Sequence, residues 1–169
     1  SSANIATGFH AGDPNWMART VKLAEQNGVG IGAHPAYPDL GGFGRREMSL
    51  SPAEIRNIVI YQIGALSAFT TLRGLQHVKP HGALYNLAAR DRLVSEAIVE
   101  AISSVDKELI HVVLAGSIWE EVAKEQGVRY ARECYADRAV TSEGQLVPRS
   151  HPGAVIHESS EVLRRSLKL

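Results

Sequence analysis

Helical and strand-like segments alternate along this chain, and this alternation limits the fold more than any other feature. The helical segments, counted with their caps, span residues 13–28, 51–74, 91–103 and 117–127. Each precedes a short apolar run, at residues 29–33, 75–79, 110–114 and 128–132. Such alternation predicts an α/β fold with a parallel sheet and right-handed crossovers. Because the strands are short and glycine-rich, the pattern favours a β/α barrel over an open sheet.

Local signals predict where the helices begin. Ser51 and Glu54 fit a capping box, in which each side chain accepts a hydrogen bond from the other residue's backbone, and Pro52 suits the first helical position. Asp13 followed by Pro14 gives the first helix a similar start. The strands therefore end just before polar turns, where α/β enzymes carry their working groups.

Composition excludes several classes of protein. With 169 residues, 44% of them hydrophobic, the chain can bury one substantial core, which predicts one domain. Its 18 basic and 18 acidic residues balance, so nothing favours binding to nucleic acid or to an anionic membrane. The single cysteine, Cys134, excludes an intrachain disulfide framework, and no apolar run is long enough to span a membrane. We expect a cytoplasmic protein.

Three short histidine motifs each follow a strand-like run. They read GFHAGD, GAHP and KPHGALY, and they place His10, His34 and His81 where an apolar segment gives way to a turn. Strand ends of a parallel sheet lie at one edge, so we expect the three imidazoles to share the pocket of an enzyme. The competing interpretation is that His10 only bonds a backbone carbonyl and that His34 is a satisfied core histidine.

Lys79 and His81 form the strongest catalytic candidate. A lysine that ends a buried strand is costly to desolvate unless it is paired or used, and its pKa can fall far enough for proton transfer. His81 titrates near neutrality, which suits general acid–base catalysis. The competing interpretation is a lysine that extends from the barrel mouth into solvent. Tyr85 offers a hydroxyl to substrate, although packing is its favoured role.

Arginines and carboxylates supply candidates for substrate binding. Arg45 and Arg46 lie in the glycine-rich segment 36–49, which is too long for a simple connection and can fold over a small anion. We expect one of these two arginines to be merely solvated. Asp137 and Arg138 follow a predicted strand and form either an internal salt bridge or part of the site.

The remaining histidines have simpler interpretations. We expect His77 and His111 to be strand residues with hydrogen-bonded imidazoles, and His151 and His157 to be surface residues. The catalytic candidates are thus Lys79, His81, His10 and His34, and the substrate-binding candidates are Asp13, Arg45, Arg46, Tyr85, Asp137 and Arg138.

A set of runs in a fixed order covers nearly the whole chain. They read SANIA, GFHAGDP, GAHP, PDL, GFGRR, YQIGAL, QHVKPHGALY, ADRA and LVPR. At these residues the chain resembles the LamB/YcsF family, whose members form the A subunit of 5-oxoprolinase. The whole set is much more specific than any single motif.

The resemblance implies both a fold and an activity. The family has a distorted, seven-stranded β/α barrel similar to the glycoside hydrolase and carbohydrate deacetylase superfamily. Its activity is the ATP-dependent opening of the lactam of 5-oxo-L-proline to give L-glutamate, with ATP as co-substrate and with two partner subunits.

Two segments typical of the family have no counterpart here. They are an acidic Asp-Leu-Asn-Cys-Asp-Leu-Gly-Glu-like first strand and a Val-His-Gly-Asp-like last strand. We therefore expect residues 1–169 to form a single β/α barrel domain that is incomplete at both ends and open. Thr7 stands where the family commonly has a cysteine, which argues against a required thiol at that position.

The chemistry of a lactam suggests a mechanism. A lactam is a poor electrophile, and phosphorylation of its oxygen by ATP would create a good leaving group. Water would then attack the ring carbon, with His81 or a family aspartate missing from this chain as general base. Lys79 would stabilise the developing charge, and Arg45 or Arg138 would hold a carboxylate or phosphate. His10 and His34 would position the lactam ring.

Two other functions stay open. One is a metal-dependent amide hydrolase or deacetylase, acting on a small or carbohydrate substrate, with the three imidazoles and a carboxylate around Zn²⁺. No local His-x-x-x-His spacing supports this set, so the sequence leaves a divalent metal undecided. The other is a non-catalytic subunit that binds a ligand while its partners perform the chemistry.

Overall fold

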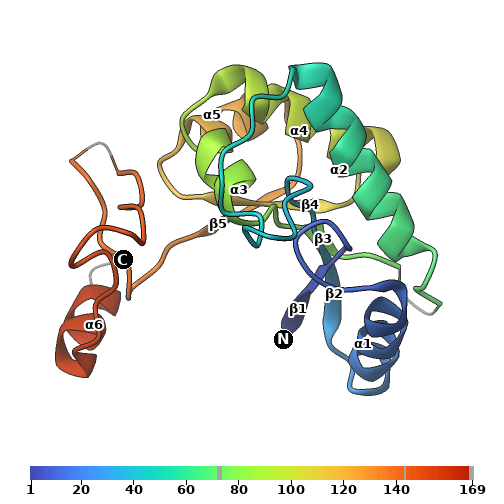
Figure 1. Ribbon diagram of the computed structural model, residues 1–169, viewed down its shortest axis with the longest axis horizontal. Coiled ribbons are helices and arrows are strands. Elements are labelled where there is room, and N and C mark those ends of the chain that lie inside the picture. The colour runs from blue at the N-terminus through green and yellow to red at the C-terminus, as the bar shows by residue number, and fades with distance from the viewer. Residues whose placement is uncertain (72–73, 143, 168–169) are drawn as a thin grey trace.

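A five-stranded parallel sheet forms the centre of the molecule, which confirms the predicted α/β class (Figure 1). The computed structural model describes residues 1–71, 74–142 and 144–167. The strands follow the order of the sequence: β1 (Ser2–Ala6), β2 (Gly30–His34), β3 (His77–Val78), β4 (Ile110–Leu114) and β5 (Tyr130–Glu133). Each strand pairs with the next, and β1 does not pair with β5 in the described part of the chain. The sheet is therefore open.

Helices connect the strands and cover the sheet. They are α1 (Pro14–Gln26), α2 (Pro52–Ser67), α3 (Gly82–Ala88), α4 (Arg92–Val105), α5 (Ile118–Glu125) and α6 (Ser159–Ser166). Figure 1 shows α2, α4 and α5 gathered on one side, α1 beside β2, and the segment that carries α6 extending away from the rest. The patterns above did not predict α3 or α6. No described helix is long and apolar enough to cross a membrane.

The predicted helix starts are confirmed, but one predicted end is wrong. Ser51 and Glu54 form the capping box, with Glu54 Oε2 accepting from the Ser51 amide at 2.8 Å. We expected this helix to continue to Gly74, yet α2 ends at Ser67. The Thr70 hydroxyl donates to the carbonyl of Ser67 at 2.8 Å, and the Phe69 amide donates to an i−3 carbonyl. These bonds satisfy the last carbonyls of α2 and close it early.

The main core lies between the sheet and the α2–α4 pair. Both helices bury branched apolar side chains whose exposed fractions are at most 1%: Ile55, Val59, Ile63, Leu66, Ile98 and Ile102. Burial of each such side chain contributes about 1.5–3 kcal/mol. The sheet is therefore fixed from one side, and its strand ends are free to carry loops.

β3 is shorter than the predicted strand at residues 75–79. Only His77 and Val78 have strand geometry, although the Lys79 amide still donates to the Ala33 carbonyl at 2.9 Å. Pro80 has no amide hydrogen and fixes its own φ, so the strand cannot continue past Lys79. The short strand places Lys79 and His81 immediately beyond the edge of the sheet.

The two strand histidines differ in their hydrogen bonds. His77 Nε2 lies 2.7 Å from Asn4 Oδ1, as predicted for a bonded imidazole. For His111, the prediction is wrong at one nitrogen, because its Nδ1 is buried and has no hydrogen-bond partner among the described residues. His151 and His157 are exposed, as expected.

His111 predicts a loss of stability in acid. Burial lowers its pKa from 6.5 to about 4, so the folded chain holds the neutral ring while the unfolded chain takes up a proton below pH 6.5. The stabilisation is complete above pH 6.5 and is lost as the pH falls toward 4. We expect a loss on the order of 2–3 kcal/mol in the free energy of unfolding. Urea unfolding across this range will measure it.

The control for this prediction is His111→Leu. Leucine removes the titrating group and leaves no buried nitrogen without a partner, so this variant should lose less stability in acid than the original chain. Equal acid losses in the two proteins would show that His111 is not responsible.

Candidate functional site

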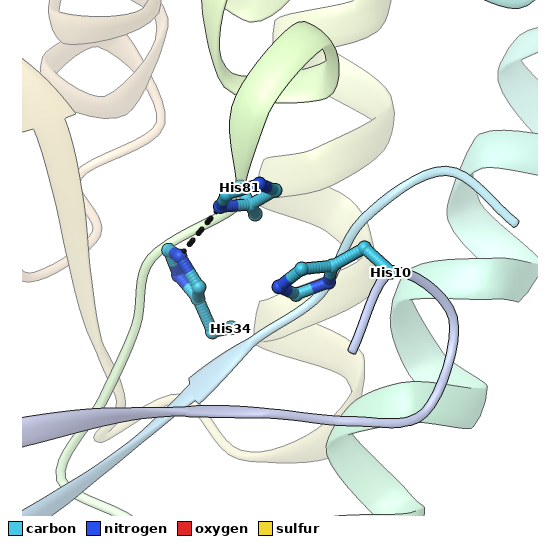
Figure 2. A group of neighbouring side chains, drawn as sticks. All are labelled: His10, His34 and His81. Carbon is cyan, nitrogen blue, oxygen red and sulfur yellow. Dashed lines mark hydrogen bonds between the residues drawn. The ribbon is translucent and has the colours of Figure 1, made fainter. Parts of the chain in front are cut away.

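The structure brings together the three imidazoles that the sequence places at strand ends (Figure 2). His10 lies in the turn after β1, His34 is the last residue of β2, and His81 follows β3. The rings of His10 and His81 are stacked, with centroids 4.0 Å apart and planes inclined by 7°. His81 Nδ1 lies 3.0 Å from His34 Nε2. We call these three residues the histidine cluster.

Two backbone carbonyls orient the cluster. His34 Nδ1 donates to the carbonyl of Lys79, and His81 Nε2 donates to the carbonyl of Phe43 at 2.9 Å. A carbonyl oxygen only accepts hydrogen bonds, so each of these ring nitrogens carries the hydrogen. The rings are thereby fixed in both orientation and tautomer.

Burial keeps the cluster neutral. Burial, together with the neighbouring imidazoles, lowers the pKa of His10 to about 4 and the pKa of His34 to about 3. Burial also lowers the pKa of His81 below its ordinary value. His81 therefore loses its proton more readily than the ordinary imidazole that the sequence led us to expect, because its ring is half-buried in the cluster. At neutral pH the cluster presents basic nitrogens, not acids.

The loop between β2 and α2 packs over the cluster. Asp39 holds it closed, accepting from the Gly42 amide at 2.9 Å and from the guanidinium of Arg46. Arg46 is thus tied to the loop and does not line the cavity described below. The same loop supplies the Phe43 carbonyl and the exposed Arg45. Of the two arginines, Arg45 is the one that lines the cavity.

The start of α3 fits tightly against this loop. Gly82 has a φ of +58°, and a Cβ on it would lie 2.4 Å from the carbonyl oxygen of Gly44. The next residue, Ala83, donates its amide to that oxygen at 2.9 Å. A glycine is therefore required at position 82 for two reasons, backbone conformation and space.

Replacing Gly82 with alanine is expected to displace the loop and to destabilise the fold. The left-handed conformation alone costs about 1–2 kcal/mol for a residue with a Cβ, and the clash with the Gly44 carbonyl adds to it. Gly28→Ala is the matched control, since Gly28 has a φ of +63° and open space around it. We expect chemical denaturation to show a larger loss for Gly82→Ala. Equal losses in the two variants would contradict the tight fit.

Lys79 forms an ion pair that sequence reasoning missed. Its Nζ lies 2.7 Å from Glu133 Oε2, and both side chains are largely buried. The hydroxyl of Tyr135 donates to the other oxygen of Glu133 at 2.8 Å. Burial opposes the charge of Lys79, but the interactions with Glu133 and Tyr135 together outweigh it and raise the pKa of Lys79. The expected fall of this pKa is wrong, and Lys79 is a fixed cation at the site.

A cavity of about 520 Å³ opens beside the cluster. It is lined by six of the predicted catalytic and binding residues, together with one further arginine: His34, Lys79, His81, Arg45, Tyr85, Arg138 and Arg149. Arg90 also lines it and is paired with Glu47. With Lys79 balanced by Glu133, three guanidinium groups remain, so the cavity favours a small anion.

Arg138 is held by backbone groups. Its exposed fraction is 6%, its Nε donates to the Ala154 carbonyl at 3.2 Å, and a terminal nitrogen donates to the Val147 carbonyl at 2.6 Å. It forms no ion pair with Asp137 in the described ranges, so the internal salt bridge considered above is absent. Its guanidinium is fixed at the cavity wall without a carboxylate to neutralise it.

Three predicted binding residues lie away from the cavity. Asp13 is exposed and caps α1, accepting from the amides of Asn15 and Trp16 at 2.8 and 3.0 Å. Asp137 is exposed, and Arg46 is bound to Asp39 as described. Tyr85 does line the cavity but packs edge-on against Trp119 with its hydroxyl buried, which agrees with its favoured interpretation.

Gln62 on α2 is a positioning residue that the sequence patterns did not reveal. Its Oε1 accepts from the Ala36 amide and the Thr7 hydroxyl, each at 2.9 Å. Its Nε2 donates to the carbonyls of Ala36 and Ile58, each at 2.9 Å. A fully buried glutamine thus ties the segment after β1 to the segment after β2. The available signal was a polar residue within an apolar helical pattern.

Comparison with known proteins agrees with this arrangement. The LamB/YcsF family profile matches residues 1–169. The chain is 55% identical to the A subunit of 5-oxoprolinase from Syntrophobacter fumaroxidans and 54% identical to that from Pyrococcus furiosus. Each alignment covers 100% of this chain, with 68% and 67% of the respective relatives.

A solved structure also matches. The crystal structure of the lactam utilization protein from Thermus thermophilus superimposes with a TM-score of 0.88 at 50% identity, over 99% of this chain and 69% of that one. The five strands thus form an open version of the predicted barrel, with the site at their ends. The chain belongs to the LamB/YcsF family.

Proposed function

We propose that this chain is one component of an ATP-dependent 5-oxoprolinase, which hydrolyses the lactam of 5-oxo-L-proline to L-glutamate. The main support is the identity above 50%, over the whole chain, to proteins named as the A subunit of 5-oxoprolinase. The cavity suits this substrate in its size and in its positive charge. In this proposal ATP is the co-substrate, two partner subunits complete the complex, and the complex works in the cytoplasm.

Charge at the cavity wall would orient the substrate. The carboxylate of 5-oxoproline and any phosphoryl group on its lactam oxygen are anions, and Arg138, Arg45 and Arg149 surround the space where they would bind. Arg138 is held in place by two backbone carbonyls, so it loses little freedom on binding. We assign the substrate carboxylate to Arg138 and a phosphoryl group to the more exposed Arg45.

Ring opening then needs a nucleophile and a stabilised charge. With the lactam oxygen phosphorylated by ATP, water adds to the ring carbon, and the carbon–nitrogen bond breaks as the ring nitrogen takes up a proton, which leaves an acyl phosphate. A second water then hydrolyses the acyl phosphate to the carboxylate of glutamate and inorganic phosphate. A neutral imidazole of the cluster, His34 or His81, accepts the proton from water. Lys79, fixed and charged, stabilises the negative charge that develops on the oxygens. His10 supports His81 by stacking against it.

Two proteins test this proposal: the chain itself, and a hybrid that carries it within a longer relative. The hybrid replaces the matching segment of the Syntrophobacter fumaroxidans relative with this chain, and both proteins are assayed with the partner subunits of that relative. We expect the hybrid to form glutamate from 5-oxoproline only when ATP and the partners are present. A well-folded hybrid that forms no glutamate under these conditions would contradict the proposal.

The metal-dependent hydrolase remains a second candidate because three imidazoles converge in the cluster. It predicts hydrolysis of an amide or acetyl group without ATP. Activity on an acetylated sugar in the absence of ATP, abolished by a chelator, would favour the metal-dependent hydrolase over the 5-oxoprolinase.

A further inference from the structure

The tautomers of the histidine cluster leave two lone pairs facing each other. His34 Nδ1 and His81 Nε2 both carry hydrogens, because each donates to a backbone carbonyl. In the neutral rings, His34 Nε2 and His81 Nδ1 therefore have no hydrogen, yet they lie 3.0 Å apart. Two unprotonated nitrogens repel each other at this distance, so the pair needs a positive centre between them.

A shared proton is a poor candidate for that centre. No described carboxylate forms an ion pair with any of the three imidazoles, so nothing nearby compensates an imidazolium. Lys79 adds positive charge near His34 and His81, and Arg45 adds more near His81. The cluster is also enclosed, with His10 buried and His34 and His81 half-buried, so a positive charge on a ring would be poorly solvated. Neutral imidazole is the form that binds metal ions.

His10 supplies a third nitrogen to the same point. Its ring is 2% exposed, and its Nδ1 is buried without a hydrogen-bond partner among the described residues. One nitrogen from each of the three rings lies within 4.8 Å of the others. Figure 2 shows the His10 ring directed toward the other two members of the cluster. To complete the set, the His10 ring must rotate out of its stack with His81, because a bound ion lies in the plane of each imidazole and nitrogens around a tetrahedral zinc lie about 3.3 Å apart.

The outer hydrogen bonds match those of a metal site. Imidazoles that bind a metal donate their second nitrogen to a carbonyl or carboxylate, which fixes their direction. His34 and His81 do this with the carbonyls of Lys79 and Phe43. Both residues also line the cavity, so a fourth coordination position would face it. Three neutral nitrogens with an open fourth position suit zinc and its neighbours among the transition metals, whereas calcium and magnesium prefer oxygen.

We propose that His10, His34 and His81 bind one divalent transition-metal ion of the zinc class. The proposal does not depend on the substrate, because it rests on the imidazole tautomers, the orphaned nitrogen of His10 and the outer hydrogen bonds. A 5-oxoprolinase and an ATP-independent hydrolase could both carry such an ion. In either enzyme the ion would occupy the nitrogens of His34 and His81 that act as the base in the metal-free scheme, and water bound to the ion would then supply the nucleophile.

Metal binding to this chain tests the proposal without any assay of activity. The chain is stripped with a chelator, then titrated with Zn²⁺ by calorimetry and with Co²⁺ by visible absorption. We expect one ion per chain and a Co²⁺ spectrum of a four-coordinate site with nitrogen ligands. His34→Gln and His81→Gln should each weaken binding by at least about 100-fold. His111→Gln is the matched control, a buried histidine outside the cluster, and should bind as the original chain does.

X-ray absorption at the zinc edge of the original chain keeps the test valid if a variant fails to fold. Three imidazole ligands are expected in that spectrum. The proposal would be overturned by an original chain that binds no ion after stripping, by a zinc spectrum without histidine ligands, or by folded His34 and His81 variants that bind as tightly as the original.

Discussion

Replacing Lys79 with methionine should reduce glutamate formation by about 10²–10³-fold, the loss usually seen when one group that stabilises a developing negative charge is removed. Methionine keeps the length of the side chain and its packing against the rings of Tyr85 and Tyr135, but it has no charge. The variant is made in the hybrid protein and assayed with the partner subunits, at saturating ATP and 5-oxoproline. The effect should appear in kcat.

The folded state should survive this substitution. Glu133 loses its partner, but it keeps the hydrogen bond from Tyr135 and can be neutralised by a proton. Lys124→Met, on the exposed face of α5, is the control for loss of a lysine and should retain full activity. If the Lys79→Met variant forms glutamate with the kcat of the original protein, Lys79 has no part in the chemistry. A non-catalytic subunit that binds a ligand then becomes the better interpretation.

Gln62→Leu should lower the free energy of unfolding by about 3–5 kcal/mol, the largest stability effect that we expect from one polar side chain here. Leucine fills similar space but leaves the Ala36 amide, the Ala36 carbonyl and the Thr7 hydroxyl without their partner. Each such buried group costs about 1–3 kcal/mol, and relaxation recovers part of the sum. Urea unfolding of this chain measures the loss directly.

Gln26→Leu provides the comparison, because Gln26 is exposed at the end of α1 and should cost little. The Gln62→Leu substitution should also shift the positions of His10 and His34. Ala36 lies two residues after His34, and Thr7 lies three residues before His10. Altered imidazole NMR shifts for His10 and His34 would show this. An unchanged stability in Gln62→Leu would mean that water replaces the lost bonds.

Local signals account for the parts of the fold that the sequence predicted well. The capping box at Ser51 works within one turn of helix, so no distant contact is needed to form it. One prediction failed on a local contact and another on a distant one. α2 ends before Gly74 because the Thr70 hydroxyl, three residues on, bonds to the carbonyl of Ser67. α3 forms in a segment whose first residue packs against the Gly44 carbonyl, far away in the sequence.

The same division applies to the site. His10, His34 and His81 could be predicted to meet, because residues at the carboxyl ends of neighbouring parallel strands share one edge of a sheet whatever their distance in the sequence. The role of Glu133 could not, since it depends on which side chain across the sheet reaches Lys79. Asp13 and Arg46 were selected by their neighbours in sequence, and local partners in the structure occupy both.

The sequence alone determined the α/β class, the family and the strand ends that carry the imidazoles, because periodicity, capping and motif order are properties of short stretches of chain. Only the tertiary structure decided the charge of each site residue and the partner of each nitrogen. Those depend on burial and on distances of a few ångströms between segments far apart in sequence, and electrostatic and hydrogen-bond energies change steeply over such distances.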